Sequence, residues 1–123
     1  MGLTSHADAT AARALEVFPD GTRRDTDGVL VIGGCRTDDL ARTYGTPALI
    51  VDEAHLRATA RRYREALATA WPAAQVTYAS KAFAATAVYR LIAEEGIWID
   101  VAGAGELELA LAAGVAPDRK SVV

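Results

Sequence analysis

The sequence predicts an α/β fold built on parallel strands. Two strand–helix pairs follow one another along the chain, at residues 76–79 with 84–95 and at residues 97–101 with 106–113. Gly96 and Gly114 stand where each helix would end, and a further β-branched run begins at Ser121. Strands that alternate with helices at this spacing are typical of βαβ units, in which a helix connects two parallel strands.

A parallel sheet has to be covered on both faces, and the few strands and helices of 123 residues cannot do this well. We therefore expect the chain to be the front piece of a larger fold. The residues alone leave two architectures open, an open doubly wound sheet and a (β/α)8 barrel.

The first half of the chain carries shorter patterns. They predict an Ala-rich helix over residues 8–17, strands at 30–32 and 48–51, and a short helix over 37–41. Gly33 and Gly34 would close the first strand, and Thr37 is a candidate N-cap for the short helix.

A long helix is predicted to begin after Asp52, its N-cap, and to reach Ala70 before Pro72. Its apolar residues recur at spacings of three and four and share one face, namely Leu56, Ala60, Tyr63 and Leu67. The arginines at positions 57, 61, 62 and 64 are spread over the rest, and we expect them to form a solvated surface.

Composition excludes several classes of protein. Apolar residues make up 51% of the chain and charged residues 24%, which excludes a wholly disordered chain. The net charge of −3 provides no basic field for nucleic acid, and no apolar run is long enough to span a membrane. The N-terminus lacks the pattern of a secretory signal, so we expect a cytoplasmic protein.

Metal and thiol chemistry have little support. Cys35 is the single cysteine, so an internal disulfide and a four-thiolate metal site are excluded, and a structural thiol is expected. His6 and His55 do not stand at a metal-ligand spacing, and we expect no metal site.

Lys81 is the first candidate for chemistry. Side chains alternate between the faces of a strand, so Lys81 shares a face with Thr77 and Ala79. That face is small, as a barrel interior requires, and Lys81 lies at the carboxyl end of the strand, where barrel enzymes build their sites. Enclosure disfavours the charged form of an amine, and a neutral amine forms Schiff bases with aldehydes. The alternative is an exposed lysine that merely follows a strand.

Asp100 is the second candidate. It alternates with Ile99 and Val101, so we expect it on the same side of the sheet as Lys81, one strand over. A carboxylate there would form an ion pair with the amine or tune it, whereas the alternative is an aspartate bonded to its own loop.

The segment Gly103-Ala104-Gly105 is only weakly similar to a dinucleotide-binding loop. Glu108 occupies the position of the third glycine, and Glu106 places negative charge where a phosphate would bind. We therefore interpret it as a tight turn with a carboxylate near the start of a helix, and we discount a Rossmann-type module.

Two motifs resemble a known family. Residues 78–83, Tyr-Ala-Ser-Lys-Ala-Phe, and residues 100–107, Asp-Val-Ala-Gly-Ala-Gly-Glu-Leu, resemble the diaminopimelate decarboxylases. These belong to the alanine-racemase-like (fold type III) group of pyridoxal phosphate enzymes. Upstream stretches at 32–34, 40–41, 44–47 and 52–57 resemble the same family, so that the resemblance covers about residues 16–119.

The resemblance implies a fold, a cofactor and an activity. Residues 52–123 would be the first βα units of an incomplete, pyridoxal-phosphate-binding (β/α)8 barrel, and residues 1–51 would contribute strands to a β-rich second domain. The activity would be decarboxylation of meso-2,6-diaminopimelate to L-lysine and CO2, the last step of lysine biosynthesis, by a homodimer with active sites at its interface.

The resemblance also implies residue roles. Lys81 would be the catalytic lysine that holds pyridoxal phosphate, and Ala79 would lie beneath the cofactor. Asp100 would line the cofactor pocket, and Glu106 would be a carboxylate that supports the site.

The chain departs from the family at Gly103, where a serine is usual, and at Lys120, where an apolar residue is usual. The family's phosphate loop and substrate arginines would lie beyond residue 123, so we expect the chain to be an N-terminal portion that is inactive alone. The alternatives are another fold type III basic-amino-acid decarboxylase or racemase and a non-catalytic pyridoxal-phosphate-binding protein.

Overall fold

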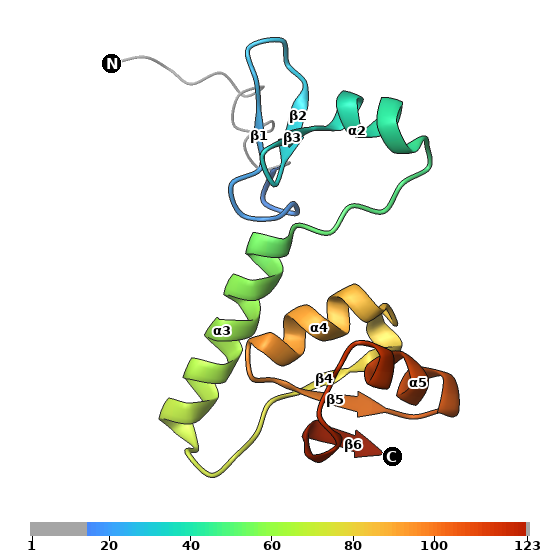
Figure 1. The fold of residues 1–123 in the computed structure, drawn as a ribbon. Helices are drawn as coiled ribbons and strands as arrows, with labels where there is room; N and C mark the ends of the chain where they lie inside the picture. The colour runs from blue at the N-terminus through green and yellow to red at the C-terminus, as the bar shows by residue number, and fades with distance from the viewer. Residues whose placement is uncertain (1–14, 123) are drawn as a thin grey trace. The chain divides into compact units, whose positions relative to one another are not determined.

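The computed structural model describes residues 15–122 (Figure 1). The chain forms two compact units, one through His55 and one from Leu56 onward. The helix expected over residues 8–17 lies almost entirely outside the described residues.

The unit through His55 contains a small antiparallel sheet. It consists of β1 (Arg23–Arg24), β2 (Leu30–Ile32) and β3 (Cys35–Arg36), in that order, followed by helix α2 (Thr37–Tyr44). The predicted strand at 30–32 and the glycine turn after it are confirmed, because Ile32 pairs with Cys35 across Gly33 and Gly34. Val31 and Ile32 supply the buried apolar side chains.

Two expectations for this unit are wrong. Thr37 is the first residue of α2, and its N-cap is Arg36, which makes no side-chain capping bond. Residues 48–51 do not form a strand, and the side chains of Leu49 and Val51 are exposed. A strand requires a partner for its backbone groups, and no described residue pairs with this apolar run.

Asp52 is confirmed as a capping residue. Its Oδ1 accepts a hydrogen bond from the His55 N–H at 3.0 Å, in the first turn of helix α3 (Glu53–Ala70). This satisfies one of the N–H groups that a helix start leaves free. The carboxylate is buried, and its Oδ2 would lie 3.3 Å from a Cβ added at Gly33.

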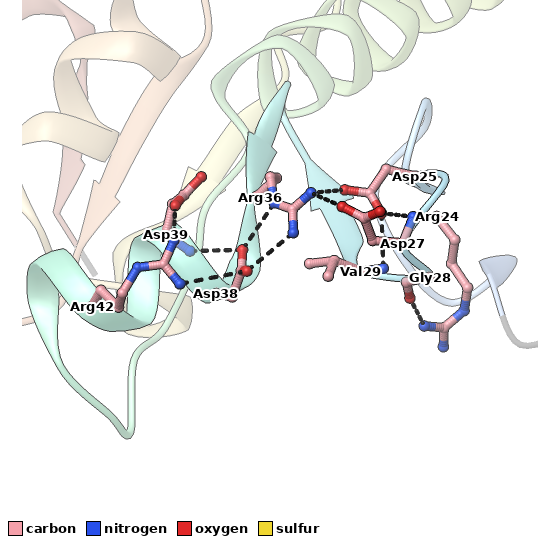
Figure 2. Close-up of polar contacts among 9 residues, drawn as sticks. All are labelled: Arg24, Asp25, Asp27, Gly28, Val29, Arg36, Asp38, Asp39 and Arg42. Carbon is pink, nitrogen blue, oxygen red and sulfur yellow. Dashed lines mark hydrogen bonds and ion pairs between the residues drawn. The ribbon is translucent and has the colours of Figure 1, made fainter.

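Charged groups hold the loop between β1 and β2 to the start of α2 (Figure 2). The Arg36 guanidinium contacts Asp25 Oδ2 at 2.5 Å, Asp27 Oδ2 at 3.0 Å and Asp38 Oδ2 at 3.1 Å. Asp25 Oδ1 in turn accepts the N–H groups of Asp27 and Val29. The hydrogen bond from Arg36 holds the pKa of Asp38 at about 2, and the acidic neighbours raise the pKa of Arg36.

The unit from Leu56 is the predicted α/β layer. Strands β4 (Thr77–Ala79), β5 (Trp98–Val101) and β6 (Lys120–Val122) are parallel and lie in that order. The 3₁₀ turn η1 (Ser80–Ala82) and helix α4 (Thr86–Glu94) connect the first two strands, and helix α5 (Ala104–Ala112) with turn η2 (Pro117–Arg119) connects the last two. Gly96 and Gly114, with φ of 78° and 79°, follow the two helices in the left-handed conformation that ends a helix.

The core of this unit lies between the sheet and its helices. Tyr89 of α4, Ile99 of β5 and Ala110 of α5 have no exposed surface, and Val101 is 1% exposed. On helix α3, Ala60 joins this core and Leu56 packs against it, whereas Tyr63 on the predicted apolar face is 67% exposed.

The expected solvated surface of α3 is confirmed for Arg61, Arg62 and Arg64, which are exposed, whereas Arg57 is partly buried. Several of these arginines also contact the end of α4. Arg57 contacts Glu94 Oε2 at 2.6 Å and Glu95 Oε1 at 3.0 Å, and its side chain is 22% exposed. Arg61 also contacts the Glu95 carboxylate, and Arg64 donates to the Glu95 carbonyl at 2.6 Å. These cations therefore lie against the C-terminal end of α4, where the helix dipole favours positive charge.

Candidate active site

The carboxyl ends of β4 and β5 bring the first two candidate residues together. In the register of the two strands, Ala79 is paired with Asp100, and Tyr78 is paired with Ile99. Ile99 belongs to the core and Tyr78 packs against it, so Ala79 and Asp100 face away from the core. The predicted placement of Asp100 on the Ala79 face is therefore confirmed.

A small pocket of about 130 Å³ opens at this end of the sheet. It is lined by Ala79, Ser80, Lys81, Asp100 and Ala102. Lys81 thus lies at the same pocket as Asp100 and away from the core.

The backbone that leads to Lys81 does not continue as the strand that the alternation argument assumed. Strand β4 ends at Ala79 and the backbone turns into η1 at Ser80, so strand alternation no longer applies to Lys81. The lysine is exposed, and the described residues do not enclose its amine. Within residues 15–122 no ion pair joins Lys81 to Asp100, although both line the pocket.

Two buried polar atoms at the pocket have no hydrogen-bond partner among the described residues. They are Ser80 Oγ and Asp100 Oδ1. Buried polar atoms are normally paired, so these two mark a place where a polar ligand atom would be stabilised. Ser80 was not predicted as a site residue, because its burial results from the packing of η1 and not from a sequence pattern.

Glu106 stands in the first turn of α5 and closes the loop after β5. Its Oε2 accepts the Ala102 N–H at 2.7 Å. The Ser80 hydroxyl, the N–H groups of Ala102 and Gly103 and the charge of Lys81 together lower the pKa of Glu106, with the hydroxyl contributing most. Because Ser80 Oγ makes no bond of ordinary geometry, we interpret its effect as that of a nearby dipole. The carboxylate is therefore kept ionised beside the pocket.

Comparison with known families identifies the segment that contains this pocket. A sequence model described as "Pyridoxal-dependent decarboxylase, pyridoxal binding domain" matches residues 53–122, which is more than half of the chain. The chain belongs to the pyridoxal-dependent decarboxylases. The family's cofactor is pyridoxal phosphate, and the unit from Leu56 lies almost entirely within the matched segment.

The relatives carry a more specific name. The chain is 43% identical over 112 residues to a diaminopimelate decarboxylase of Actinosynnema pretiosum subsp. auranticum, and this covers 89% of the chain and 24% of the relative. It is 43% identical over 104 residues to the diaminopimelate decarboxylase of Bacillus subtilis (strain 168), covering 84% and 24%. The chain therefore spans about a quarter of the length of the curated relatives it matches.

Solved structures support the fold assignment. The structure of diaminopimelate decarboxylase from M. jannaschii in complex with L-lysine superimposes with a TM-score of 0.75 at 30% identity, covering 85% of this chain and 25% of that one. The chain thus has the fold of the N-terminal region of the pyridoxal-binding barrel, and the parallel strands β4, β5 and β6 make up part of that barrel. This confirms the barrel over the open doubly wound sheet.

The residues at the pocket fit a pyridoxal cofactor. Lys81 offers an amine for the aldehyde, and Ser80 Oγ and Asp100 Oδ1 are unpaired polar atoms beside it. Within the part of the chain that the structure describes, no group of three His, Cys, Asp or Glu side chains gathers as metal ligands would. No helix between residues 15 and 122 has the length and apolar character needed to cross a bilayer.

Proposed function

We propose that this chain supplies the lysine that attaches the cofactor in a barrel enzyme. That enzyme uses pyridoxal phosphate to decarboxylate meso-2,6-diaminopimelate to L-lysine and CO2. The observation that carries the proposal is the pocket at the ends of β4 and β5, where Lys81 lies beside two unpaired buried polar atoms. The names of the relatives and a related structure that holds L-lysine support this substrate over ornithine or arginine.

In this proposal each residue at the pocket has a distinct task. Lys81 is the catalytic residue, because its amine attaches the aldehyde carbon of the cofactor. Ala79 would provide a small side chain beneath the cofactor, and Asp100 would provide an unpaired oxygen toward the same space. Glu106 keeps a negative charge near Lys81 and holds the loop after β5 in place.

When bound, pyridoxal phosphate supplies a pyridinium ring that takes up the electrons left by the departing carboxylate. Lys81 and the other residues that line the pocket would hold the cofactor. The strands also hold the lysine and Asp100 at one pocket, at the carboxyl ends of β4 and β5.

The rest of the organisation is part of the same proposal. Residues 52–123 begin the barrel, and residues 1–51 contribute strands to a β-rich second domain. A pocket of about 310 Å³, lined largely by apolar side chains of α3 and β4, supports further barrel elements packing beside β4. The protein works in the cytoplasm as a homodimer and binds no nucleic acid, in keeping with its net charge of −3.

Covalent trapping tests the attachment residue. The chain contains two lysines, Lys81 and Lys120, so one molecule provides both the test and its control. We expect borohydride reduction in the presence of pyridoxal phosphate to fix the cofactor to Lys81 in preference to Lys120, as peptide mapping by mass spectrometry would show. Lys81→Arg should abolish this product and Lys120→Arg should leave it unchanged. Equal labelling of both lysines would contradict the assignment.

Product analysis tests the reaction. CO2 release from meso-diaminopimelate should be compared with release from L-ornithine and L-arginine, for this chain and for any longer product of the same gene. We expect CO2 and L-lysine to be released from diaminopimelate, and no CO2 from ornithine or arginine. Faster CO2 release from ornithine or arginine would show that the proposed substrate is wrong. Cofactor binding without turnover of any of the three substrates would favour a non-catalytic pyridoxal-phosphate-binding protein.

A further inference from the structure

A side chain of strand β4 closes the turn that carries Lys81. Turn η1 (Ser80–Ala82) follows Ala79, the last residue of β4, and is itself followed by Phe83. The Tyr78 hydroxyl donates a hydrogen bond to the Phe83 carbonyl at 3.2 Å. This bond joins the strand before the turn to the residue after it, so that Lys81 lies within a closed loop.

The ring of Tyr78 is held in place by the core. Tyr78 packs against the apolar core cluster, and its ring meets the ring of Tyr89 edge to face. The two ring centroids lie 6.3 Å apart, and the ring planes are inclined at 69°. Aromatic pairs of this geometry are stabilised beyond the area that they bury. The Tyr78 hydroxyl therefore reaches the turn from a ring whose position is fixed.

The hydroxyl is in the chemical state that the contact needs. Burial raises the pKa of Tyr78 above its ordinary value of 10.0, so the hydroxyl stays protonated near neutral pH. A backbone carbonyl oxygen only accepts hydrogen bonds, so the tyrosine has to be the donor. The turn has no side-chain cap at Ala79, which leaves the bond to Phe83 as the side-chain contact that closes it.

The two tyrosines of the aromatic pair differ at their hydroxyl groups. Tyr89 is fully buried, and its hydroxyl oxygen has no hydrogen-bond partner among the described residues. The Tyr78 hydroxyl has the Phe83 carbonyl. Since both rings take part in the same aromatic contact, the bond to the turn distinguishes Tyr78 from a residue that only packs.

We propose that Tyr78 is a positioning residue, whose hydroxyl closes turn η1 and holds the backbone of Lys81 at the pocket. This role rests on the proposed attachment of the cofactor to Lys81. The lysine side chain is exposed, so the place of its amine at the pocket depends on the backbone of the turn. A turn that is ordered before the cofactor arrives loses less conformational freedom when the cofactor is attached.

Backbone ¹⁵N relaxation of the whole chain tests this closure without any cofactor. Tyr78→Phe keeps the ring and removes only the hydroxyl. We expect the order parameter of the Lys81 N–H to fall from the value of rigid backbone, about 0.85, toward about 0.6. The Ile99 N–H in β5 is the internal reference and should keep its value. An unchanged order parameter at Lys81 in Tyr78→Phe would overturn the inference.

Tyr89→Phe is the matched control, because it removes the hydroxyl of the other ring of the pair. That hydroxyl has no partner among the described residues, so its loss should leave the order parameter of Lys81 unchanged. An equal fall at Lys81 in both variants would show that a general loosening of the core, and not the bond to Phe83, is responsible.

Two replacements of similar shape keep the test valid if Tyr78→Phe does not fold. In place of Tyr78, 4-aminophenylalanine keeps a donor on the ring, whereas 4-methylphenylalanine fills the same space without one. We expect the first to preserve the order of the Lys81 backbone and the second to lose it. Equal order in the two proteins would show that packing, and not the hydrogen bond, holds the turn.

Borohydride trapping separates this inference from the proposed function. We expect Tyr78→Phe to lower the trapping of pyridoxal phosphate at Lys81 by about 2- to 10-fold, the net worth of one hydrogen bond, and to leave Lys120 unchanged. If the backbone of Lys81 loosens but Lys81 is never labelled in preference to Lys120, the attachment role is wrong and the closure of the turn stands. If Lys81 is labelled preferentially and to the same extent in Tyr78→Phe, the attachment role stands and the positioning role of Tyr78 is wrong.

Discussion

The two units of this chain are stabilised by different forces. From Leu56 onward, parallel strands lie under helices, and side chains such as Tyr89, Ile99 and Ala110 are entirely buried. Through His55, the described part of the chain buries only Val31 and Ile32 among its apolar side chains and depends on a network of Arg36 with three aspartates.

The difference follows from the strands themselves. Strands of two or three residues in an antiparallel sheet offer little apolar surface, so apolar burial contributes little to the stability of the first unit. The remaining contacts of its side chains are largely exposed ion pairs. A parallel sheet packed under helices removes most of its inner face from water. The first unit should therefore respond to pH and salt, and the second to changes of side-chain volume.

The largest expected effect is in the apolar core. Ile99→Ala should destabilise the unit from Leu56 by about 2–5 kcal/mol, because it removes methyl groups from a fully packed site. Urea unfolding followed by circular dichroism measures the loss. Leu111→Ala, at a residue that is 55% exposed, is the matched control and should cost much less. Equal losses would show that the core does not dominate this unit.

An intermediate effect is expected in the ion network of the first unit. Arg36→Met should return the pKa of Asp38 from about 2 toward its ordinary value of 3.8, because the hydrogen bond from Arg36 is the main cause of the lowering. A lowered carboxyl pKa stabilises the folded state above the unfolded pKa, and this contribution is lost as pH falls from about 4 toward 2. NMR titration of Asp38 measures the change.

Arg42→Met is the control for that experiment. Arg42 also contacts Asp38, at 3.5 Å, but it is the smallest of the causes that lower the pKa of Asp38. Its removal should shift the titration less than Arg36→Met does, and high salt should reduce both shifts. A larger shift of the Asp38 pKa in Arg42→Met than in Arg36→Met would show that Arg42, and not Arg36, is the main cause of the lowered pKa.

The smallest effect is expected at Gly103, the N-cap of α5. Its φ of −149° suits any residue, an added Cβ would meet no atom within 4 Å, and α5 has no side-chain cap. Gly103→Ser should stabilise the chain by a few tenths of a kcal/mol, since serine and the glutamate at position 106 would form a capping box. The melting temperature of Gly103→Ala should be lower than that of Gly103→Ser. The reverse order would exclude helix capping as the reason for the serine that is usual in the family at this position.

The sequence alone was sufficient for the elements that have a strong local pattern. The strands near 76–79 and 97–101, the helices after them and the glycines that end them all follow from alternation, helical spacing and conformational preference. The face of Asp100 follows as well, because strand geometry has a period of two residues. The family motifs added the cofactor and the candidate roles, which no periodicity indicates.

Contacts between distant residues were decided only by the tertiary structure. Residues 48–51 have the composition of a strand but no partner among the described residues, and Arg57 reaches glutamates more than 35 positions away. Strand alternation predicted an inward Lys81, but the turn at Ser80 leaves it exposed and buries the serine. Local preferences act within a few residues along the chain, whereas burial and pairing depend on which segments pack together, and for this reason the pocket became visible only in the folded structure.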